Sequence, residues 1–204
     1  MALVVLDRDQ QNELIRQRRE SGADHHDEVW DGVYVMSPNA DNEHFDLAGD
    51  FLFVVKSALP DRKQVRVSSG VNVSDRQKNW TKNFRCPDLA IFFPENPAKD
   101  MGTYWFGGPD FALEVISPHD RSRKKLAFYA KIGVRELLLL DRDPWSLELY
   151  RLTDGELKLI GESTSARPVI LTSQVLPITF TLVPDEPRPT IQVTQANDGR
   201  QWTI

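Results

Sequence analysis

Two carboxylates stand in segments that are otherwise apolar. Glu114 is the one polar residue in the run Phe111–Ile116, and Asp88 directly precedes the apolar run Leu89–Phe93. Burying an unpaired carboxylate is costly, so each acid must be paired, protonated, metal-bound or at the wet end of its strand. If the two acids meet across a sheet, their oxygens, a backbone carbonyl and water can bind a hard cation such as Mg²⁺. The alternative is structural, with each carboxylate paired to a nearby Arg or Lys.

Two adjacent lysines follow the second acid. Lys124 and Lys125 fall about one turn into a helix that is predicted to start after Ser117-Pro118 and to end at Gly133. An ammonium beside a metal site can orient a water molecule or help to deprotonate it, and it offsets the charge of a phosphate. A solvated helix face is the alternative interpretation, and it is the usual one for a single lysine.

The segments that must position these residues alternate between helical and strand patterns. Apolar residues spaced three and four apart predict a helix over residues 41–58, which Pro60 ends. Strands are predicted within 65–73, 87–93, 111–116 and 135–141, with a hairpin over 146–152 and 156–162 and further strands near Val169 and Ile178. Strands mixed with helices at this spacing imply an α/β sheet.

The chain of 204 residues is expected to form one domain with two appendages. We expect an N-terminal helical extension over residues 1–23 and the main domain over residues 24–183. Residues 184–204, where prolines cluster and apolar residues are few, are expected to form a tail. At the start of the main domain, the tight-turn dipeptide Asp31-Gly32 predicts two short paired strands.

Composition restricts the class of protein. With 40% hydrophobic and 27% charged residues, the chain has the make-up of a folded globular protein. No apolar run approaches the ~20 residues that a membrane span needs. Cys86 is the one cysteine, which excludes an internal disulfide, and the N-terminus is not a convincing signal peptide. A cytoplasmic protein is therefore the expectation.

The net charge of −5 hides an uneven distribution. Residues 61–85 contain seven basic and two acidic residues, and residues 121–135 contain six basic and no acidic residues. An acidic protein, taken alone, argues against nucleic-acid binding. Both basic stretches nevertheless flank Asp88 and Glu114 in the sequence, where a phosphate backbone would be expected to lie. The net charge therefore does not exclude a nucleic-acid substrate, bound weakly and in a salt-sensitive manner.

The order of these motifs resembles that of a known family. The residues that carry the resemblance are Asp31-Gly32, Met36-Ser37-Pro38, His44, Pro87-Asp88, Glu114-Val115-Ile116-Ser117-Pro118, Asp120, Lys125, Tyr129, Gly133-Val134-Arg135-Glu136 and Asp141. Over about residues 24–152 they resemble the Uma2 family, also called DUF820, which is placed in the PD-(D/E)xK restriction-endonuclease-like superfamily. The resemblance implies an αβββαβ core around a mixed sheet, which agrees with the α/β class that the patterns predict.

The resemblance also implies roles for individual acids. Asp88 and Glu114 would be the ligands of Mg²⁺, or alternatively Mn²⁺, with the backbone carbonyl of Val115 beside them. A Glu from the first helix often assists in the superfamily, and Glu43 is the candidate for that role.

The lysine departs from the superfamily pattern. It usually stands two residues after the Glu, at the position where this chain has Ile116. The family is expected to supply the lysine from the following helix instead. Lys125 fits best, four residues before Tyr129, and Lys124 is a close second.

Three classes of function remain open. The first is a metal-dependent nuclease that hydrolyses phosphodiester bonds, with DNA as the expected partner. The second is a non-catalytic nucleic-acid-binding or regulatory protein on the same fold, which the displaced lysine and the acidic net charge keep open. The third is a structural or oligomeric module, because hairpin strands over residues 146–162 could pair between chains and form a homodimer.

Four further features of the sequence are interpreted one by one. Adjacent histidines on a strand point to opposite faces, so His25-His26 is not expected to share a metal ion. His44 is expected to hydrogen-bond locally, with phosphate contact as the alternative. The stretch Lys78–Arg85 could form a loop that touches nucleic acid. Cys86 is expected to pack near Asp88 without doing chemistry.

Overall fold

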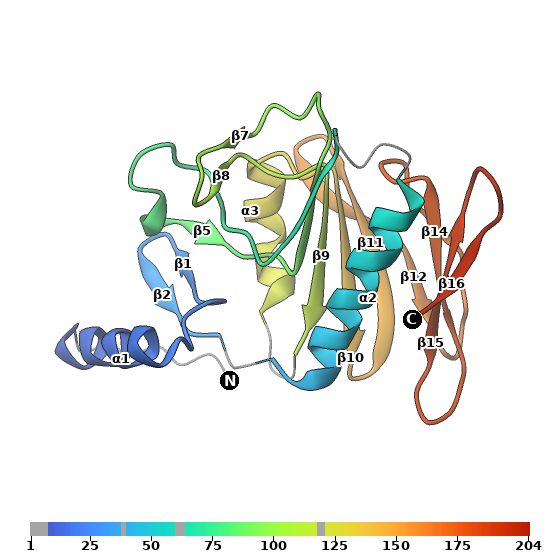
Figure 1. Ribbon diagram of the computed structural model, residues 1–204, viewed down its shortest axis with the longest axis horizontal. Helices are drawn as coiled ribbons and strands as arrows, with labels where there is room; N and C mark the ends of the chain where they lie inside the picture. The colour runs from blue at the N-terminus through green and yellow to red at the C-terminus, as the bar shows by residue number, and fades with distance from the viewer. Residues whose placement is uncertain (1–7, 38–39, 60–63, 118–120) are drawn as a thin grey trace.

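The computed structural model describes residues 8–37, 40–59, 64–117 and 121–204 (Figure 1). Three sheets are present in these ranges, and helix α2 lies against one face of the largest sheet while helix α3 lies against the other. The mixed α/β class expected from the sequence is confirmed. The predicted helix start at Pro118 to Asp120 lies outside the described residues, as do the basic residues Arg62 and Lys63.

The main sheet has six strands in the order β12–β11–β10–β9–β6–β3. Its strands are β3 (Arg66–Ser69), β6 (Leu89–Phe92), β9 (Phe111–Ile116), β10 (Glu136–Arg142), β11 (Trp145–Thr153) and β12 (Glu156–Thr164). Strands β9 and β10 are parallel, and all other neighbouring pairs are antiparallel, so the sheet is mixed. Every residue of β6 and β9 is buried, which explains why these strands are continuous apolar runs without alternation.

Helix α2 takes the position that its pattern predicts, whereas the predicted second helix is a 3₁₀ turn followed by a short α-helix. The helices are α1 (Arg8–Ser21), α2 (Asn42–Ala58) and α3 (Leu126–Lys131), with short 3₁₀ helices η1 (Trp80–Lys82) and η2 (Ser122–Lys125). Helix α2 begins where the side chain of Asp41 accepts a hydrogen bond from the backbone N–H of His44 at 2.8 Å. None of the helices in the described ranges is long and apolar enough to cross a membrane.

A smaller sheet carries the N-terminal hairpin. Its strands, in the order β2–β1–β5–β4–β8–β7, are β1 (Glu28–Trp30), β2 (Val33–Val35), β4 (Val73–Ser74), β5 (Phe84–Arg85), β7 (Lys99–Asp100) and β8 (Trp105–Phe106). The turn between β1 and β2 uses Asp31 and Gly32, whose φ angles are 49° and 88°. These left-handed values are what a two-residue hairpin turn requires, so the predicted turn forms as expected.

The tail predicted for residues 184–204 is wrong, because this region forms strands. A four-stranded sheet in the order β13–β14–β15–β16 contains β13 (Leu171–Thr172), β14 (Ile178–Val183), β15 (Thr190–Gln195) and β16 (Gln201–Thr203). In β15 the buried residues Ile191 and Val193 alternate with more exposed polar ones, and both join the main hydrophobic core. The clustered prolines precede β15 and do not interrupt it.

Alternation along β9 decides which way Glu114 faces. Leu113 and Val115 pack into the core that α2 and the C-terminal sheet form on one face of the main sheet. Ala112 and Ile116 pack into the second core on the face of α3. Because side chains alternate along a strand, Glu114 points to the α3 face together with Ala112 and Ile116.

Candidate active site

Neighbouring central strands bring the two predicted acids together. In the antiparallel pair β6–β9, Leu89 lies opposite Leu113, so the same register places Asp88 opposite Glu114. The backbone N–H of Val115 donates a hydrogen bond to Asp88 Oδ2 at 2.7 Å. The expectation that these acids meet across the sheet therefore agrees with the structure.

Both acids line one small cavity of about 60 Å³. Its other lining residues come from β1, from the start of α2, from η2 and from the ends of β6 and β9, and they are His26, Glu28, Ser37, Ala40, His44, Cys86, Val115, Ser117 and Lys125. A buried water needs about 10–15 Å³, so the cavity has room for a small cation with a few waters. Asp88, Glu114, Val115 and Lys125 were all predicted for a single site, and the structure gathers all of them here.

Glu114 is held by three side chains from the following helical segment. Lys125 Nζ donates to Glu114 Oε1 at 3.1 Å and to Oε2 at 2.9 Å, and Ser122 Oγ donates to Oε2 at 3.4 Å. The hydroxyl of Tyr129 also donates to Glu114 Oε1. Burial, followed by the charge of Glu114, raises the pKa of Tyr129 well above its usual value, so this phenol stays a neutral donor.

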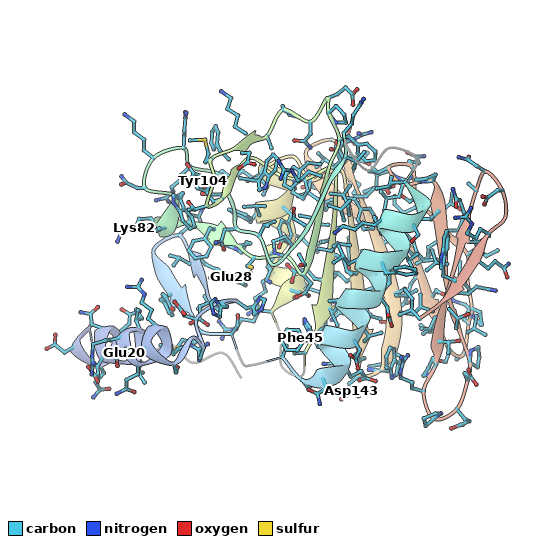
Figure 2. The ribbon with its side chains drawn as sticks, viewed as in Figure 1. Glu20, Glu28, Phe45, Lys82, Tyr104 and Asp143 are labelled. Atoms are coloured by element: carbon cyan, nitrogen blue, oxygen red, sulfur yellow. The ribbon has the colours of Figure 1, made fainter. Side chains whose placement is uncertain are left out.

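A third carboxylate, which the sequence reasoning did not assign, completes the cavity. Glu28 of β1 is 2% exposed, and its Oε1 lies 2.9 Å from Lys125 Nζ (Figure 2). Trp30 Nε1 donates to Glu28 Oε2 at 2.6 Å, and the backbone N–H of Cys86 donates to Oε1 at 2.9 Å. Lys125 therefore bridges Glu28 and Glu114. Glu28 begins the three-residue strand β1, and only Val29 and Trp30 follow it before Asp31, so its sequence signal is weaker than that of Asp88.

The strand that carries Glu28 also separates the two adjacent histidines. His26 lines the active-site cavity, whereas His25 lines a different cavity on the other side of β1. Both histidines lie in the turn before β1 and not on the strand that the prediction assumed, but they line different cavities. The thiol of Cys86 lies 4.0 Å from His26 Nδ1, and burial raises its pKa, which keeps it protonated.

The ring of His44, on helix α2, contacts the carboxylate of Asp88. Its Nε2 lies 2.9 Å from Asp88 Oδ1, and its Nδ1 lies 3.4 Å from Ser117 Oγ. The expected local hydrogen bond of this ring is thus replaced by one to a candidate metal ligand. Together with the Val115 N–H, His44 fixes both oxygens of Asp88.

The structure places Glu43 and Lys124 outside the cavity. Glu43 pairs with Arg142 at 2.9 Å and with Arg188 at 3.5 Å. Adjacent residues on a helix point about 100° apart, so α2 can present His44 or Glu43 to the cavity but not both. Lys124 is exposed for the same reason, since its neighbour Lys125 faces Glu114.

The donor set of the cavity suits a hard divalent cation. Three carboxylates, those of Glu28, Asp88 and Glu114, line it against the single ammonium of Lys125. A divalent cation would offset this excess negative charge, and carboxylate oxygens are the ligands that Mg²⁺ prefers. Within the described ranges, no three or more His, Cys, Asp or Glu side chains are grouped so that together they could hold a metal ion. The residues that could hold Mg²⁺, which keeps several waters, are Asp88 and Glu114 with the backbone carbonyl of Val115.

Among the described residues, many basic side chains of the two predicted stretches are paired with acids or buried. In the second stretch, four of the six basic side chains are paired with acids. The pairs are Arg123 with Asp141 and Glu148, Lys125 with Glu28 and Glu114, Lys131 with Asp75, and Arg135 with Asp110. In the first stretch, Arg85 is buried between the rings of Trp30 and Phe128. The charge available for a phosphate backbone is therefore smaller than the sequence count implies.

The fold is similar to that of a solved structure from Anabaena variabilis ATCC 29413, which is described as a "putative nuclease belonging to DUF820". The two share 18% identity with a TM-score of 0.52, over 65% of this chain and 75% of the other. The fold is thus that of the nuclease-like mixed α/β class.

The chain belongs to the Uma2 family. The model of that family, described as "Putative restriction endonuclease", matches residues 12–184. The resemblance stated from the motifs is therefore confirmed, and the family suggests a nuclease. No curated protein matches the sequence.

Proposed function

We propose that this protein is a metal-dependent nuclease that hydrolyses phosphodiester bonds in DNA. The observation that carries the proposal is the meeting of Asp88, Glu114 and Lys125 in one buried cavity. Asp88, Glu114 and the carbonyl of Val115 would hold Mg²⁺, with Mn²⁺ as a possible substitute. The bound ion supplies a water of lowered pKa and offsets charge that develops at phosphorus.

The remaining side chains of the cavity hold these groups in place. Lys125 fixes the carboxylate of Glu114, and the positive charge of its ammonium would offset the charge of a phosphate. Glu28 keeps Lys125 in position from the other side. His44 and the Val115 N–H orient Asp88, as partners of a metal ligand commonly do.

A non-catalytic nucleic-acid-binding or regulatory protein on the same fold is the second candidate. It is favoured by the contacts of Glu114, whose carboxylate is already bonded by Lys125, Tyr129 and Ser122. A carboxylate satisfied in this way is stable without an ion. The pairing of two copies through the β11–β12 hairpin also stays a prediction, which light scattering tests.

A cleavage assay decides between the two candidates. Single-stranded DNA, duplex DNA and RNA are incubated with Mg²⁺ or Mn²⁺, and cleavage is compared among wild type, Asp88→Asn and Glu114→Gln. The matched control is Glu43→Gln, which makes the same chemical change at an acid that lies outside the cavity. We expect DNA cleavage that needs the metal, is lost in the first two variants and persists in the control. Full cleavage by both cavity variants contradicts the proposal.

Calorimetry with Mg²⁺ gives an independent measurement. A binding heat that disappears in Glu114→Gln supports the nuclease. Nucleic-acid binding that needs no metal and is unchanged in that variant, together with no cleavage, supports the non-catalytic alternative.

A further inference from the structure

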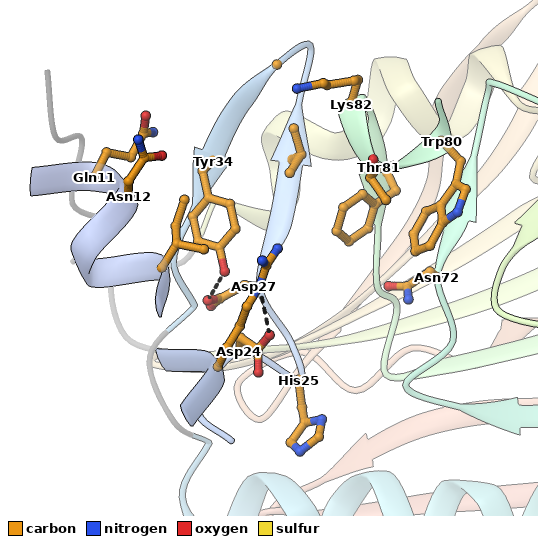
Figure 3. Close-up of a pocket in the computed structure, with 15 residues that line it drawn as sticks. Gln11, Asn12, Asp24, His25, Asp27, Tyr34, Asn72, Trp80, Thr81 and Lys82 are labelled. Atoms are coloured by element: carbon orange, nitrogen blue, oxygen red, sulfur yellow. Dashed lines mark hydrogen bonds and ion pairs between the residues drawn. The ribbon is translucent and has the colours of Figure 1, made fainter. Parts of the chain in front are cut away.

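A second and larger cavity lies on the other side of β1 from the candidate active site (Figure 3). It has a volume of about 530 Å³, within the range of ~300–1,000 Å³ that is usual for small-ligand sites. Successive side chains of this segment point to opposite sides. Asp27 and Val29 line this groove, whereas His26 and Glu28 line the active-site cavity. Only the thickness of one strand separates the two cavities.

Strand register builds an apolar and aromatic floor for this groove. Val29 of β1 lies opposite Tyr34 of β2 and opposite Phe84 of β5, so the three side chains form a row across three strands. All three line the groove. Rows of aromatic side chains on an open sheet face are surfaces on which unstacked nucleobases are bound.

Trp80 of η1 extends this floor as a fixed aromatic wall. Its ring stacks on Tyr104, with centroids 4.7 Å apart and an interplanar angle of 13°, and contacts Phe84 edge-on at 5.1 Å. In Figure 3, Tyr34 and Trp80 lie on the two sides of the groove, with Lys82 near its rim. Because two neighbouring rings hold Trp80, a ligand that stacks there meets a surface that is already ordered.

The polar groups of the groove suit a nucleotide. The side-chain amides of Gln11, Asn12 and Asn72 line it, and among the described residues they have no hydrogen-bond partner. Each amide offers donors and an acceptor that can meet the edge of a base.

The groove is lined by two acids, Asp24 and Asp27, and by two cations, Arg19 and Lys82. Its acids are matched by arginines, since Asp27 pairs with Arg18 at 2.6 Å and Asp24 lies 3.9 Å from Arg19. Lys82 is exposed and, within the part of the chain that the structure describes, forms no ion pair. The unbalanced charge at the rim is positive, as a phosphate backbone requires.

We propose that this groove binds an unpaired stretch of a DNA strand, with bases stacked over Tyr34, Phe84 and Trp80 and a phosphate against Lys82. The inference rests on the proposed function and names the form of its substrate. A duplex hides the faces of its bases within the helix, whereas an unpaired strand exposes them to aromatic side chains. The preferred substrate is therefore DNA with a single-stranded segment next to the cleaved bond.

Binding is measured by fluorescence anisotropy in the presence of EDTA, so that no cleavage takes place. The probe is a fluorescein-labelled thymidine oligonucleotide of about 12 nucleotides, within the usual site sizes. We expect Trp80→Ala to weaken its binding by about 5- to 160-fold, the effect of losing one stacked base. We expect Lys82→Ala to lower the slope of log affinity against log salt by about 0.7, the effect of one phosphate contact on a single strand.

Matched controls keep the test independent of folding and of catalysis. Lys56→Ala removes an exposed lysine on α2, away from the groove, and should leave affinity and salt slope unchanged. Because EDTA prevents cleavage, the binding measurement does not depend on catalysis. If wild type does not cleave DNA but Lys82→Ala and Trp80→Ala still weaken binding, the nuclease proposal fails and the groove stands.

Three results overturn the inference. One is equal affinity for the single strand and for a duplex of the same length. Another is a Lys82→Ala variant that behaves like Lys56→Ala. The third is competition by inorganic polyphosphate as strong as competition by unlabelled oligonucleotide, which shows that the bases contribute nothing.

Discussion

The bridge that Lys125 makes between two buried carboxylates allows a quantitative prediction. Its Nζ lies 2.9 Å from Glu28 and 2.9 Å from Glu114, whose side chains are 3% and 4% exposed. Lys125→Met keeps the length of the side chain but removes its charge and its donors. Removing one partner of a buried ion pair costs about 3–5 kcal/mol, because the remaining charge is left buried without compensation. Here one substitution affects two carboxylates.

The expected loss converts into a measurable change in unfolding. For a protein of this size, 1 kcal/mol corresponds to about 2–4 °C in Tm, so Lys125→Met should unfold about 6–20 °C below wild type. Calorimetry gives Tm, and urea titration followed by tryptophan fluorescence gives the free energy of unfolding. Lys124→Met is the matched control, since that side chain is exposed and its loss should cost no more than about 0.5 kcal/mol.

A double variant tests the physical cause. In Lys125→Met combined with Glu114→Gln, one of the two uncompensated charges is gone, while Tyr129 can still donate to the amide oxygen and the Ser122 hydroxyl can accept from the amide nitrogen. The double variant should therefore be more stable than Lys125→Met alone. Equal stability of Lys125→Met and Lys124→Met refutes the reasoning, and so does a double variant in which the two losses simply add.

Three further predictions concern other parts of the molecule. Burial raises the pKa of the Cys86 thiol, so a thiol reagent at pH 8 should label it only as fast as the protein unfolds; rapid labelling of the folded protein contradicts this. Burial and the charge of Glu114 raise the pKa of Tyr129 in the folded protein above its value of about 10 in the unfolded chain. The neutral phenol therefore stabilises the fold below about pH 10, and this stabilisation is lost as the pH rises further. Absorbance at 295 nm, which reports the ionised phenol, should then rise together with loss of structure. A Cβ on Gly108 would lie 2.8 Å from the backbone oxygen of Ile132, so Gly108→Ala should destabilise by about 1–3 kcal/mol in urea titration, and an unchanged midpoint rules out this steric account.

Long or uniformly apolar elements could be predicted from the sequence because their own residues determine them. Helix α2 begins at Asn42 and ends at Ala58, within one residue of the expected 41–58, since its apolar spacing and the Asp41 cap are local signals. Strand β9 spans Phe111–Ile116 as expected, because a six-residue apolar run has few alternatives. The acids in and beside such strands could be identified for the same reason.

What the sequence did not predict depends on contacts between distant segments. Glu28 lies in a three-residue strand, and its role follows from contacts with Cys86 and Lys125, which are far away in the chain. Strands β15 and β16 are similar, because these short stretches become strands only when β15 pairs with β14 and β16 pairs with β15. The pairing of several basic side chains depends on distant contacts in the same way, since an ion pair such as that of Lys131 with Asp75 cannot be read from a charge count.

The side chains that bind Glu114 make one helical segment intolerant of changes in length. Ser122, Lys125 and Tyr129 are spaced three and four residues apart, so one face of that segment presents all of them. A single residue inserted between Lys125 and Tyr129 would rotate one contact away from the other by about 100°. The length of this segment is therefore fixed more tightly than the identity of its exposed residues, such as Lys124 and Ala127.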